Sequence, residues 1–587
     1  MQSRTHTCGE LRIGNVGSTV TLAGWMENLR EVGSSLGFAV IRDFYGTTQI
    51  VIETEEMMKA FRSINKESTI NVTGTVRERS SKNPKQATGD IEVVPESVKV
   101  LGSCRYRELP FEINRSREAD EAARLKYRYL DLRRPVLLEN LKTRAKIVKI
   151  WHDYFDAHHF LEVETPILNL SSPEGARDYL VPSRIHHGCF YALPQSPQLW
   201  KQLLMVGGVE RYYQVAKCFR DEDLRADRQP EFTQLDEEVS FMTQDEILAL
   251  NEGFLKRIFK EIAGVDIQLP LRRMPFYEAL DRYGSDKPDT RFGLLIEDLY
   301  DVMKDLPFDG FKGQDYIRGI VVPGVASTAS RKVIDECVNE ARKMRLKGLI
   351  ALKYLNGELE GSFTKFMDED AKASLIKRLD LKEGDLLLFG SSSSRRIISF
   401  ALGAVRLMWA KKLELVKPNT YDLLWVVDFP MFDKEVDEEG NVTYAAEHHP
   451  FTRPRDEDLA LLETKPEDML AYAYDIVING YEAGGGTLRI YDRETQWKVF
   501  RLLGLSEEDV RIKFGWFADA FRYGAPPHGG MAYGLERLTM ILCGTDNIRD
   551  VIAFPKNLQA TDPTSKAPQK VTKEQLEPLA IQVLDEE

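Results

Sequence analysis

The sequence predicts a multidomain α+β protein with an N-terminal five-stranded β-barrel, a domain built on an antiparallel sheet, and an inserted α/β domain. The first observation behind this prediction is the length of 587 residues, which exceeds what one hydrophobic core supports. The second is a series of short β-branched segments separated by turns near the N-terminus. The third is the alternation of strand-like and helix-like segments between residues 286 and 420.

Composition narrows the classes of function. No apolar run approaches the ~20 residues that cross a bilayer, and residues 1–14 lack the apolar centre of a secretory signal. We therefore expect a cytoplasmic protein without a membrane partner. The net charge of −13 argues mildly against a nucleic-acid partner, although it says nothing about local basic patches. The cysteines form no C-x-x-C pair, so neither a zinc site nor a disulfide framework is predicted.

The N-terminal segment, residues 1–105, is typical of a small closed barrel of the OB type, whose outer face binds oligonucleotides. This prediction depends on five β-branched runs and on the glycine-containing turns between them. The five runs cover residues 20–25, 38–42, 48–52, 70–76 and 91–100.

The rest of the chain is divided by changes in pattern. A long amphipathic helix is predicted from about residue 137 to residue 159. We expect one sheet domain to be interrupted by the inserted domain, because strand-like segments stop before the insertion and resume after it. The predicted parts are a helical linker at 106–140, the sheet domain at 141–285 and 421–560, the insertion at 286–420, and a C-terminal extension at 561–587.

A charged hairpin is predicted between residues 213 and 241, with its loop at 221–230. Alternation along a strand places Arg220 and Glu222 on one face of the first strand, and Gln234 and Asp236 on one face of the second. An arginine in such a platform can bind a phosphate or a carboxylate with two hydrogen bonds. Charge alone is equally compatible with a loop that is simply solvated.

A second stretch, residues 472–493, contains two carboxylates and a run of three glycines. On one regular strand Asp475 and Glu482 face opposite ways, so we expect a bulge at Gly480 to bring them to one face. Two carboxylates beside phosphate oxygens are the usual protein ligands of Mg²⁺. A hairpin turn with surface acids is the alternative.

The third stretch, residues 529–542, is a glycine-rich strand that leads into an apolar helix, with Arg537 in its first turn. A helix start combined with an arginine can bind an anion. Many unrelated loops also fit so short a pattern.

Taken together, these stretches resemble class II aminoacyl-tRNA synthetases. Phe219–Glu222 resembles their motif 2, Gly534–Arg537 their motif 3, and Phe160–Pro166 their motif 1. The segments Ser172–Tyr179, Gln195–Lys201 and Asp223–Pro230 are similar to aspartyl-tRNA synthetases, and an insertion between motifs 2 and 3 is typical of the bacterial form. The barrel resembles the anticodon-binding domain of this subgroup.

The resemblance implies an aspartate–tRNA ligase that uses Mg²⁺. Such an enzyme activates L-aspartate with ATP to aspartyl-adenylate and pyrophosphate, and transfers aspartate to the 3′ end of tRNA(Asp). Whether tRNA(Asn) is a second substrate stays open, although Val32 and Lys82, at positions linked to tRNA discrimination, favour strict recognition. The alternatives are an asparaginyl or lysyl ligase, a catalytically silent RNA-binding relative, and an ammonia-using asparagine synthetase. Arg489 and Lys201 argue against lysine, since its ammonium would be repelled.

The resemblance also implies roles for individual residues. The expected catalytic residues are Arg220 and Arg537. The expected ATP ligands are Arg220, Asp221, Glu222, Gln229, Glu482, Gly534, Leu535, Glu536 and Arg537. The expected aspartate ligands are Glu174, Gln198, Lys201, Arg220, Asp236, His448 and Arg489, with His449 beside them. Asp475 and Glu482 are the expected Mg²⁺ ligands, Phe38, Gln49 and Glu92 the expected anticodon contacts, and Pro166 the expected residue of a homodimer interface.

Overall fold

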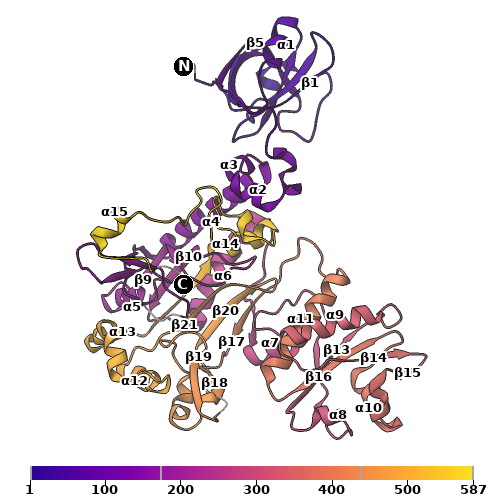
Figure 1. Ribbon diagram of the computed structural model, residues 1–587, viewed down its shortest axis with the longest axis vertical. Coiled ribbons are helices and arrows are strands. Elements are labelled where there is room, and N and C mark those ends of the chain that lie inside the picture. The colour runs from indigo at the N-terminus through magenta and orange to yellow at the C-terminus, as the bar shows by residue number, and fades with distance from the viewer. Residues whose placement is uncertain (1–2, 172–174, 437–438, 585–587) are drawn as a thin grey trace. The chain divides into compact units, whose positions relative to one another are not determined.

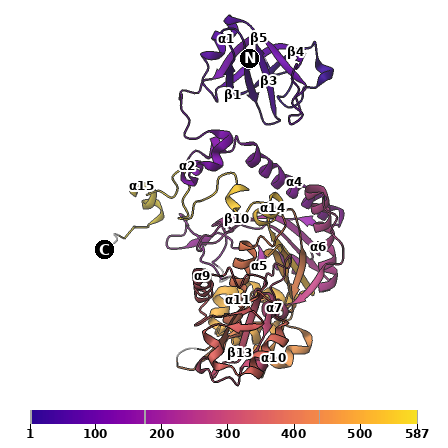
Figure 2. The same cartoon turned by 90° about the vertical axis from the view of Figure 1, so that its right-hand side faces the viewer.

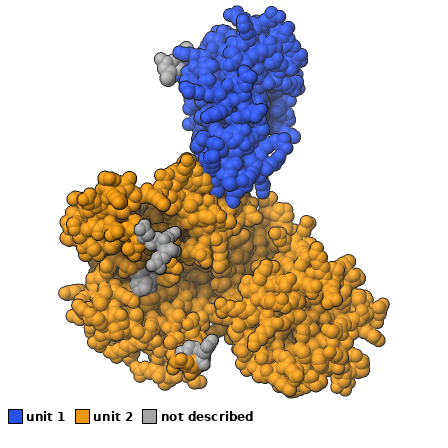
Figure 3. All heavy atoms as spheres, viewed as in Figure 1, with its two compact units in different colours: residues 1–138 blue, residues 139–587 orange. Residues whose placement is uncertain are grey.

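The computed structural model describes residues 3–171, 175–436 and 439–584. The chain forms two compact units, residues 1–138 and 139–587 (Figure 3). Each unit contains a hydrophobic core of its own. Among the described residues, no helix has both the length and the apolar character required to cross a membrane.

The first unit contains the predicted barrel (Figure 1). Its strands close in the order β1-β2-β3-β5-β4. All five predicted runs are strands, and each extends beyond its predicted limits at one or both ends. The helix α1 (Glu55–Arg62), which connects β3 to β4, was not predicted; Thr54 caps it by accepting a hydrogen bond from the Met57 N–H. The strands are β1 (Thr19–Glu31), β2 (Gly37–Arg42), β3 (Thr47–Ile52), β4 (Thr69–Glu78) and β5 (Ile91–Gly102).

The helical linker follows the barrel as α2 (Glu121–Lys126) and α3 (Arg128–Asp131). The buried Asp131 carboxylate holds it together by accepting from Ser116 and Arg128. The predicted long helix is α4 (Pro135–Ala157), and its limits agree with the predicted ones within two residues.

The second unit is built on an eight-stranded sheet with the order β11-β17-β20-β21-β22-β10-β9-β6. Segments from both sides of the insertion form it, as expected. The pairs β11–β17 and β6–β9 are parallel and the pairs between them are antiparallel. The strands are β6 (Leu161–Glu162), β9 (Arg211–Phe219), β10 (Glu231–Ser240), β11 (Arg272–Pro275), β17 (Leu423–Val427), β20 (Ala473–Ile478), β21 (Tyr481–Leu488) and β22 (His528–Gly534).

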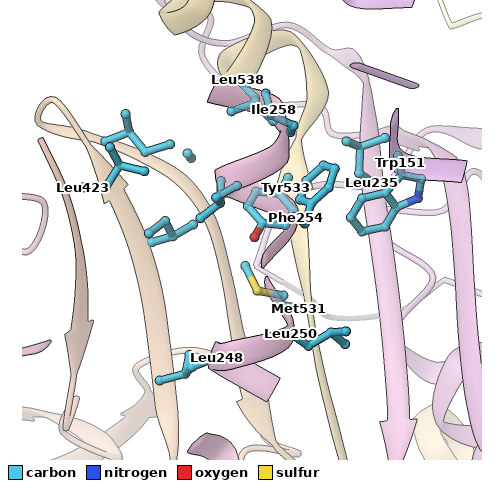
Figure 4. Packing of buried hydrophobic residues seen from close by; sticks show 14 of the residues in the cluster. Trp151, Leu235, Leu248, Leu250, Phe254, Ile258, Leu423, Met531, Tyr533 and Leu538 are labelled. Carbon is cyan, nitrogen blue, oxygen red and sulfur yellow. The ribbon is translucent and has the colours of Figure 1, made fainter. Parts of the chain in front are cut away.

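Helices α4, α6 (Gln244–Ile258) and α14 (Leu535–Cys543) cover one face of this sheet (Figure 2). The large core lies between them, and Trp151 packs there against Phe254 and Tyr533, with ring centroids 4.9 and 6.0 Å apart (Figure 4). Because successive side chains of a strand point to opposite faces, the remaining residues of β10, β20 and β21 are presented on the other face.

The insertion forms a second sheet with the order β12-β13-β16-β14-β15. Helices and strands alternate in it as expected, and the printed strand pairs are all antiparallel. One core packs α9 and α11 against this sheet and another packs α8 and α10. The elements are β12 (Ile296–Asp298), α8 (Tyr300–Met303), β13 (Tyr316–Val322), α9 (Arg331–Lys343), β14 (Ile350–Leu355), β15 (Glu358–Glu360), α10 (Glu369–Leu379), β16 (Leu386–Ser392) and α11 (Arg395–Lys412).

Smaller elements surround the main sheet. All six cysteines are free in the structure. The remaining elements are β7 (Leu180–Pro182), β8 (Phe190–Ala192), α5 (Gln198–Val206), α7 (Phe276–Tyr283), β18 (Phe432–Val436), β19 (Val442–Ala446), α12 (Arg493–Leu502), α13 (Glu507–Ala520) and α15 (Lys573–Leu576).

Candidate active site

The predicted charged hairpin is formed by β9 and β10. β9 ends at Phe219, and Arg220 follows it with its backbone N–H donating to the Pro230 carbonyl at 2.8 Å. The Arg220 guanidinium lies over the Phe232 ring, 5.0 Å from its centroid, and Nε donates to the Gln195 carbonyl at 3.4 Å. These contacts hold Arg220 where the hairpin loop begins.

Other residues of the loop are held by the protein itself. The Glu222 carboxylate accepts from Arg228 at 3.1 Å, and the Asp221 N–H donates to the Arg177 carbonyl at 3.0 Å. The buried Gln229 side chain makes two hydrogen bonds to the Lys556 backbone, at 3.0 and 2.8 Å. Gln229 thus ties the loop to the C-terminal segment, and its contact with a nucleotide remains a prediction.

A buried ionic cluster lies on the face of β10 that points away from α4, α6 and α14 and that α5 covers. Asp236 and Glu238 are two residues apart and share this face. Lys201, from α5, places Nζ 2.7 Å from Asp236 Oδ1 and 3.2 Å from Glu238 Oε2. These three side chains are almost completely buried. Sequence reasoning missed Glu238, although the period of two that pairs Gln234 with Asp236 also leads to it.

Arg489 completes the cluster just beyond β21. Its Nε and one terminal nitrogen bind the two oxygens of Glu238 at 2.9 and 3.0 Å. That terminal nitrogen also donates to the Gly530 carbonyl, and the other one donates to Thr487 Oγ1 at 2.5 Å and to His449 Nε2 at 2.8 Å. The five N–H groups of the guanidinium therefore all meet protein acceptors.

The cluster sets the charges of its members. Burial alone would raise the pKa of Glu238, but Arg489 and Lys201 outweigh it and lower that pKa to about 2. Burial raises the pKa of Asp236, with Lys201 opposing it. Burial and Arg489 lower the pKa of His449 well below its usual value, so the ring is neutral. Because a guanidinium only donates, His449 Nε2 accepts from Arg489, and the other ring nitrogen, Nδ1, faces the Phe451 N–H at 3.3 Å.

Three residues expected to bind aspartate keep a buried polar atom without a protein partner in the described part of the chain. These atoms are Asp236 Oδ2, Gln198 Nε2 and His448 Nδ1. Buried polar atoms are normally hydrogen-bonded, so such orphans point to a ligand or water. Glu174, the remaining expected ligand, lies outside the described residues.

The two carboxylates expected to bind metal lie on the β20–β21 hairpin and share a face, but not through a bulge at Gly480. Asn479 and Gly480 instead form the two-residue turn, with φ of 55° and 82°. The register pairs Val477 with Glu482, and paired residues of antiparallel strands share a face. The bulge lies farther along β21, between the Val477–Glu482 and Ile476–Gly484 pairs. Asp475 and Glu482 thus lie on the two strands of one hairpin and not on a single strand.

The surroundings of these carboxylates suit a cation. Burial and the neighbouring Asp475 raise the pKa of Glu482. His448 Nε2 lies 3.7 Å from Asp475 Oδ1. A Cβ added to Gly485 would lie 2.2 Å from the same Asp475 oxygen, so glycine leaves the space that this carboxylate occupies. Within the described residues, no group of three or more His, Cys, Asp or Glu side chains could hold a metal ion; a cation here needs further oxygens from its ligand.

Arg537 connects the carboxylates to the charged hairpin loop. It lies in the first turn of α14, and its terminal nitrogens donate to the Glu482 carbonyl at 2.7 Å and to Asp227 at 3.3 Å. The neighbouring Glu536 side chain is buried, and its carboxylate accepts hydrogen bonds from Arg144 and from the Thr233 N–H. Leu535 belongs to the main core, so the side chains of both residues anchor α14.

On the barrel, the three expected anticodon contacts lie on the adjacent strands β2, β3 and β5. The Gln49 amide donates to Glu92 at 2.9 Å, and Arg77 from β4 donates to the same carboxylate at 2.8 Å. The Phe38 ring is partly exposed, with the Arg30 guanidinium 5.8 Å from its centroid. A partly exposed ring contradicts the alternative of a buried core phenylalanine.

Val32 and Lys82 occupy the two barrel loops that usually border an oligonucleotide site, the β1–β2 and β4–β5 connections. Val32 is 56% exposed, and Lys82 pairs with Glu78 at 2.8 Å. Both can therefore contact a ligand on the outer face of the barrel.

Pro166 follows the edge strand β6 and is exposed. Apolar side chains around it are also exposed, and a monomer seldom leaves such a cluster in water. They are Leu161, Ile167, Leu168 and Leu170, with 50–57% of each exposed.

Comparison with known proteins agrees with this architecture. Residues 120–558 match the family of tRNA synthetases class II (D, K and N), and residues 20–101 match the OB-fold nucleic acid binding domain. The protein therefore belongs to the class II tRNA synthetases.

Within that family, the chain is similar over its whole length to aspartate–tRNA ligases. It is 47% identical to the aspartate–tRNA ligase of Shouchella clausii, covering 99% of both chains. It is 48% identical to the aspartate–tRNA(Asp/Asn) ligase of Anoxybacillus flavithermus, covering 100% of this chain and 99% of the relative.

Solved structures share the fold at lower identity. The asparaginyl-tRNA synthetase from Pyrococcus horikoshii has a TM-score of 0.58 at 18% identity, over 94% of this chain and 98% of that one. The aspartyl-tRNA synthetase from Entamoeba histolytica has a TM-score of 0.57 at 18% identity, over 94% and 91% of the two chains.

Proposed function

We propose that the protein is an aspartate–tRNA ligase that activates L-aspartate with ATP and transfers it to the 3′ end of tRNA(Asp). The observation that carries this proposal is the pair of buried cations, Lys201 and Arg489, beside the orphan oxygen of Asp236. An amino acid with a carboxylate side chain complements the two cations, and its ammonium complements Asp236. A lysine side chain would meet like charge instead.

In the first step, an oxygen of the aspartate α-carboxylate attacks the α-phosphorus of ATP. The bond to the bridging oxygen breaks, and pyrophosphate leaves with that electron pair. Arg220 binds the α-phosphate and the substrate carboxylate, and Arg537 binds the terminal phosphate. Glu222 accepts from the adenine amine. No protein nucleophile takes part, so catalysis rests on orientation and on stabilisation of charge.

Asp475 and Glu482 would hold Mg²⁺ in this reaction. They fit the ion because two carboxylates share one face, and phosphate oxygens and waters can supply the other ligands. When bound, the ion neutralises charge on the phosphates.

Selection of aspartate depends on Arg489 and Lys201. Since each N–H of Arg489 already has a protein acceptor, a substrate carboxylate that binds Arg489 directly replaces one of these partners. Thr487 and His449 are neutral and share one terminal nitrogen, so they are easier to replace than Glu238. Asparagine would leave Arg489 imperfectly paired in this dry site, and such a mismatch gives a selectivity against asparagine of order 10⁴.

The test is exchange of labelled pyrophosphate into ATP without tRNA. We expect exchange that requires aspartate and Mg²⁺. Exchange with asparagine or lysine but not with aspartate would show that aspartate is not the substrate.

In the second step, a hydroxyl of the 3′-terminal ribose attacks the aspartyl carbonyl and AMP leaves. The enzyme acts as a homodimer in the cytoplasm.

The anticodon is read on the barrel by Phe38, Gln49 and Glu92, through stacking and through hydrogen bonds to base edges. The relatives include one named aspartate–tRNA ligase and one named aspartate–tRNA(Asp/Asn) ligase. From Val32 and Lys82 we propose strict recognition of tRNA(Asp). Charging purified tRNA(Asp) and tRNA(Asn) transcripts tests this, and equal charging contradicts it.

A further inference from the structure

A lysine that the sequence motifs did not include lies beside the two carboxylates of the β20–β21 hairpin. Lys287 belongs to the linker between α7 and β12, at the start of the insertion. Its Nζ is 3.8 Å from Glu482 Oε2 and 3.3 Å from Asp286 Oδ2. The side chain is 43% exposed, so its ammonium can reach a ligand as well as Glu482.

The linker that carries Lys287 is held firmly against the catalytic sheet. Asp289 lies against the hairpin turn, where a Cβ on Gly480 would be 3.0 Å from the Asp289 Cβ. Thr290 donates to Asp422, at the point where the chain returns from the insertion. These contacts of the linker therefore keep Lys287 close to Glu482.

The buried Arg406, from α11 of the insertion, fixes the same linker. Its guanidinium lies 4.0 Å from the Phe292 ring centroid and donates to four backbone carbonyls of the linker. These carbonyls belong to Asp289, Phe292, Gly293 and Leu294. Because these hydrogen bonds already fix the backbone of the linker, little further conformational entropy of that backbone is lost when Lys287 binds a ligand.

The charges around Glu482 indicate which kind of ligand Lys287 can bind. Asp475 and Asp286 are the neighbouring anions, and Arg537 and Lys287 are the neighbouring cations. A divalent cation on Asp475 and Glu482 would neutralise the anions that now face Lys287. Lys287 would keep Asp286, 3.3 Å away, as one partner, and the phosphate oxygens that accompany such a cation would replace Glu482 as the other, since an ammonium is a common phosphate ligand.

We propose that Lys287 binds the terminal phosphates of ATP and the pyrophosphate formed from them. When the bond between the α-phosphorus and the bridging oxygen breaks, negative charge accumulates on the departing pyrophosphate. Lys287 stabilises that charge from the linker side and Arg537 from the side of α14. The insertion is thereby connected to the reaction through one residue of its first linker. This inference rests on the proposed function.

The test compares Lys287→Met with Lys287→Arg, and with Lys417→Met in the return linker as a matched control. Binding of inorganic pyrophosphate with Mg²⁺ is measured by titration calorimetry, and KM values for ATP, pyrophosphate and aspartate by exchange. We expect Lys287→Met to weaken pyrophosphate binding roughly 10- to 100-fold, with the KM for aspartate changed by less than about twofold. Lys287→Arg should recover most of the affinity, and Lys417→Met should behave as wild type.

Two results would overturn the proposal. One is unchanged pyrophosphate affinity in Lys287→Met. The other is a parallel loss for pyrophosphate and aspartate with a lower Tm, which would assign Lys287 a structural role. Failure of the proposed function is distinguishable, because the wild-type protein itself would then show no aspartate-dependent exchange.

Discussion

Single residues in the active site serve structure and chemistry together, and Arg489 is the clearest case. The same guanidinium that is expected to select aspartate also neutralises the buried Glu238. Removing one partner of a buried ion pair is costly because it leaves the other charge unpaired. Loss of activity in an Arg489 variant therefore has two possible physical causes, and they need to be separated.

The first prediction separates them with Glu238→Gln. Arg489→Leu should lower the free energy of unfolding by about 3–5 kcal/mol, because Glu238 stays buried without its cation. The double variant Arg489→Leu with Glu238→Gln should regain part of that stability, since no stranded charge remains. It should not regain kcat/KM for aspartate, which we expect to be reduced roughly 10²- to 10³-fold.

Chemical denaturation and exchange kinetics on the three variants check this prediction. The KM for ATP should stay close to wild type in each of them. If kcat/KM for aspartate returned together with stability in the double variant, Arg489 would have no direct role in substrate selection.

A second prediction concerns Glu237, which faces the core between its two ionic neighbours. Burial raises its pKa from 4.5 to about 8, and its Oε1 accepts from the Met531 N–H at 3.1 Å and from Asn251 at 3.3 Å. The folded protein thus keeps a proton that the unfolded chain releases above pH 4.5. This contribution to stability is complete below pH 4.5 and is lost as the pH rises to about 8.

Over this pH range the free energy of unfolding falls by roughly 5 kcal/mol, at about 1.4 kcal/mol for each pH unit. Glu237→Gln should therefore flatten the decline of Tm between pH 5 and pH 8, while Glu261→Gln on the surface should leave it unchanged. Identical pH profiles for wild type and Glu237→Gln would show that Glu237 is ionised in the folded protein.

At the scale of elements, the β20–β21 hairpin determines where a metal can bind. The Asn479–Gly480 turn sets the register that brings Asp475 and Glu482 to one face. The glycines of β21 then keep this face open, because a side chain at Gly485 would occupy the place of the Asp475 carboxylate.

The third prediction follows from this crowding. In Gly485→Ala the added methyl group would meet Asp475 Oδ1 at 2.2 Å, so the carboxylate must move. We expect the Mg²⁺ concentration for half-maximal exchange to rise several-fold, roughly the loss of one charge-assisted contact. The KM for aspartate should change little.

Gly348→Ala is the control, since a Cβ there meets nothing within 4 Å. An unchanged Mg²⁺ requirement in Gly485→Ala would remove Asp475 from the metal site.

At the scale of the whole molecule, the exposed apolar residues around Pro166 form the surface at which we expect a second copy of the chain to bind. Leu161 belongs to the edge strand β6 of the main sheet, and the chain after β6 carries Ile167, Leu168 and Leu170. An isologous contact between two copies would cover this surface and the sheet edge together.

The fourth prediction is that the protein is a dimer and that Ile167→Asp weakens the dimer. A carboxylate placed in an apolar interface must be desolvated without a partner, which costs several kcal/mol. Analytical ultracentrifugation at micromolar concentration checks both statements. Leu584→Asp, at an exposed position in the C-terminal segment, is the control. A monomeric, fully active wild-type protein would contradict the prediction.

The sequence by itself determined the elements whose signals are local. The five barrel strands, the helix α4 and the helix–strand alternation of the insertion depend on periodicity and turn residues, which neighbouring residues specify. The motif stretches likewise led to Arg220, Arg537, Asp475 and Glu482 as proposed site residues, because each lies within a short pattern of distinctive chemistry. Helix α1 was missed because it is short and connects two predicted strands.

Only the tertiary structure decided how residues distant in sequence share the site. Glu238 and Arg489 are 251 residues apart, and their pairing depends on the packing of β10 beside β22 and β21. The position of the bulge depended on a strand register, which turn geometry and cross-strand pairing set jointly. Lys287 reaches Glu482 because a linker is clamped against a hairpin far along the chain. Such contacts leave no periodic trace in the sequence, since they depend on burial and charge in three dimensions.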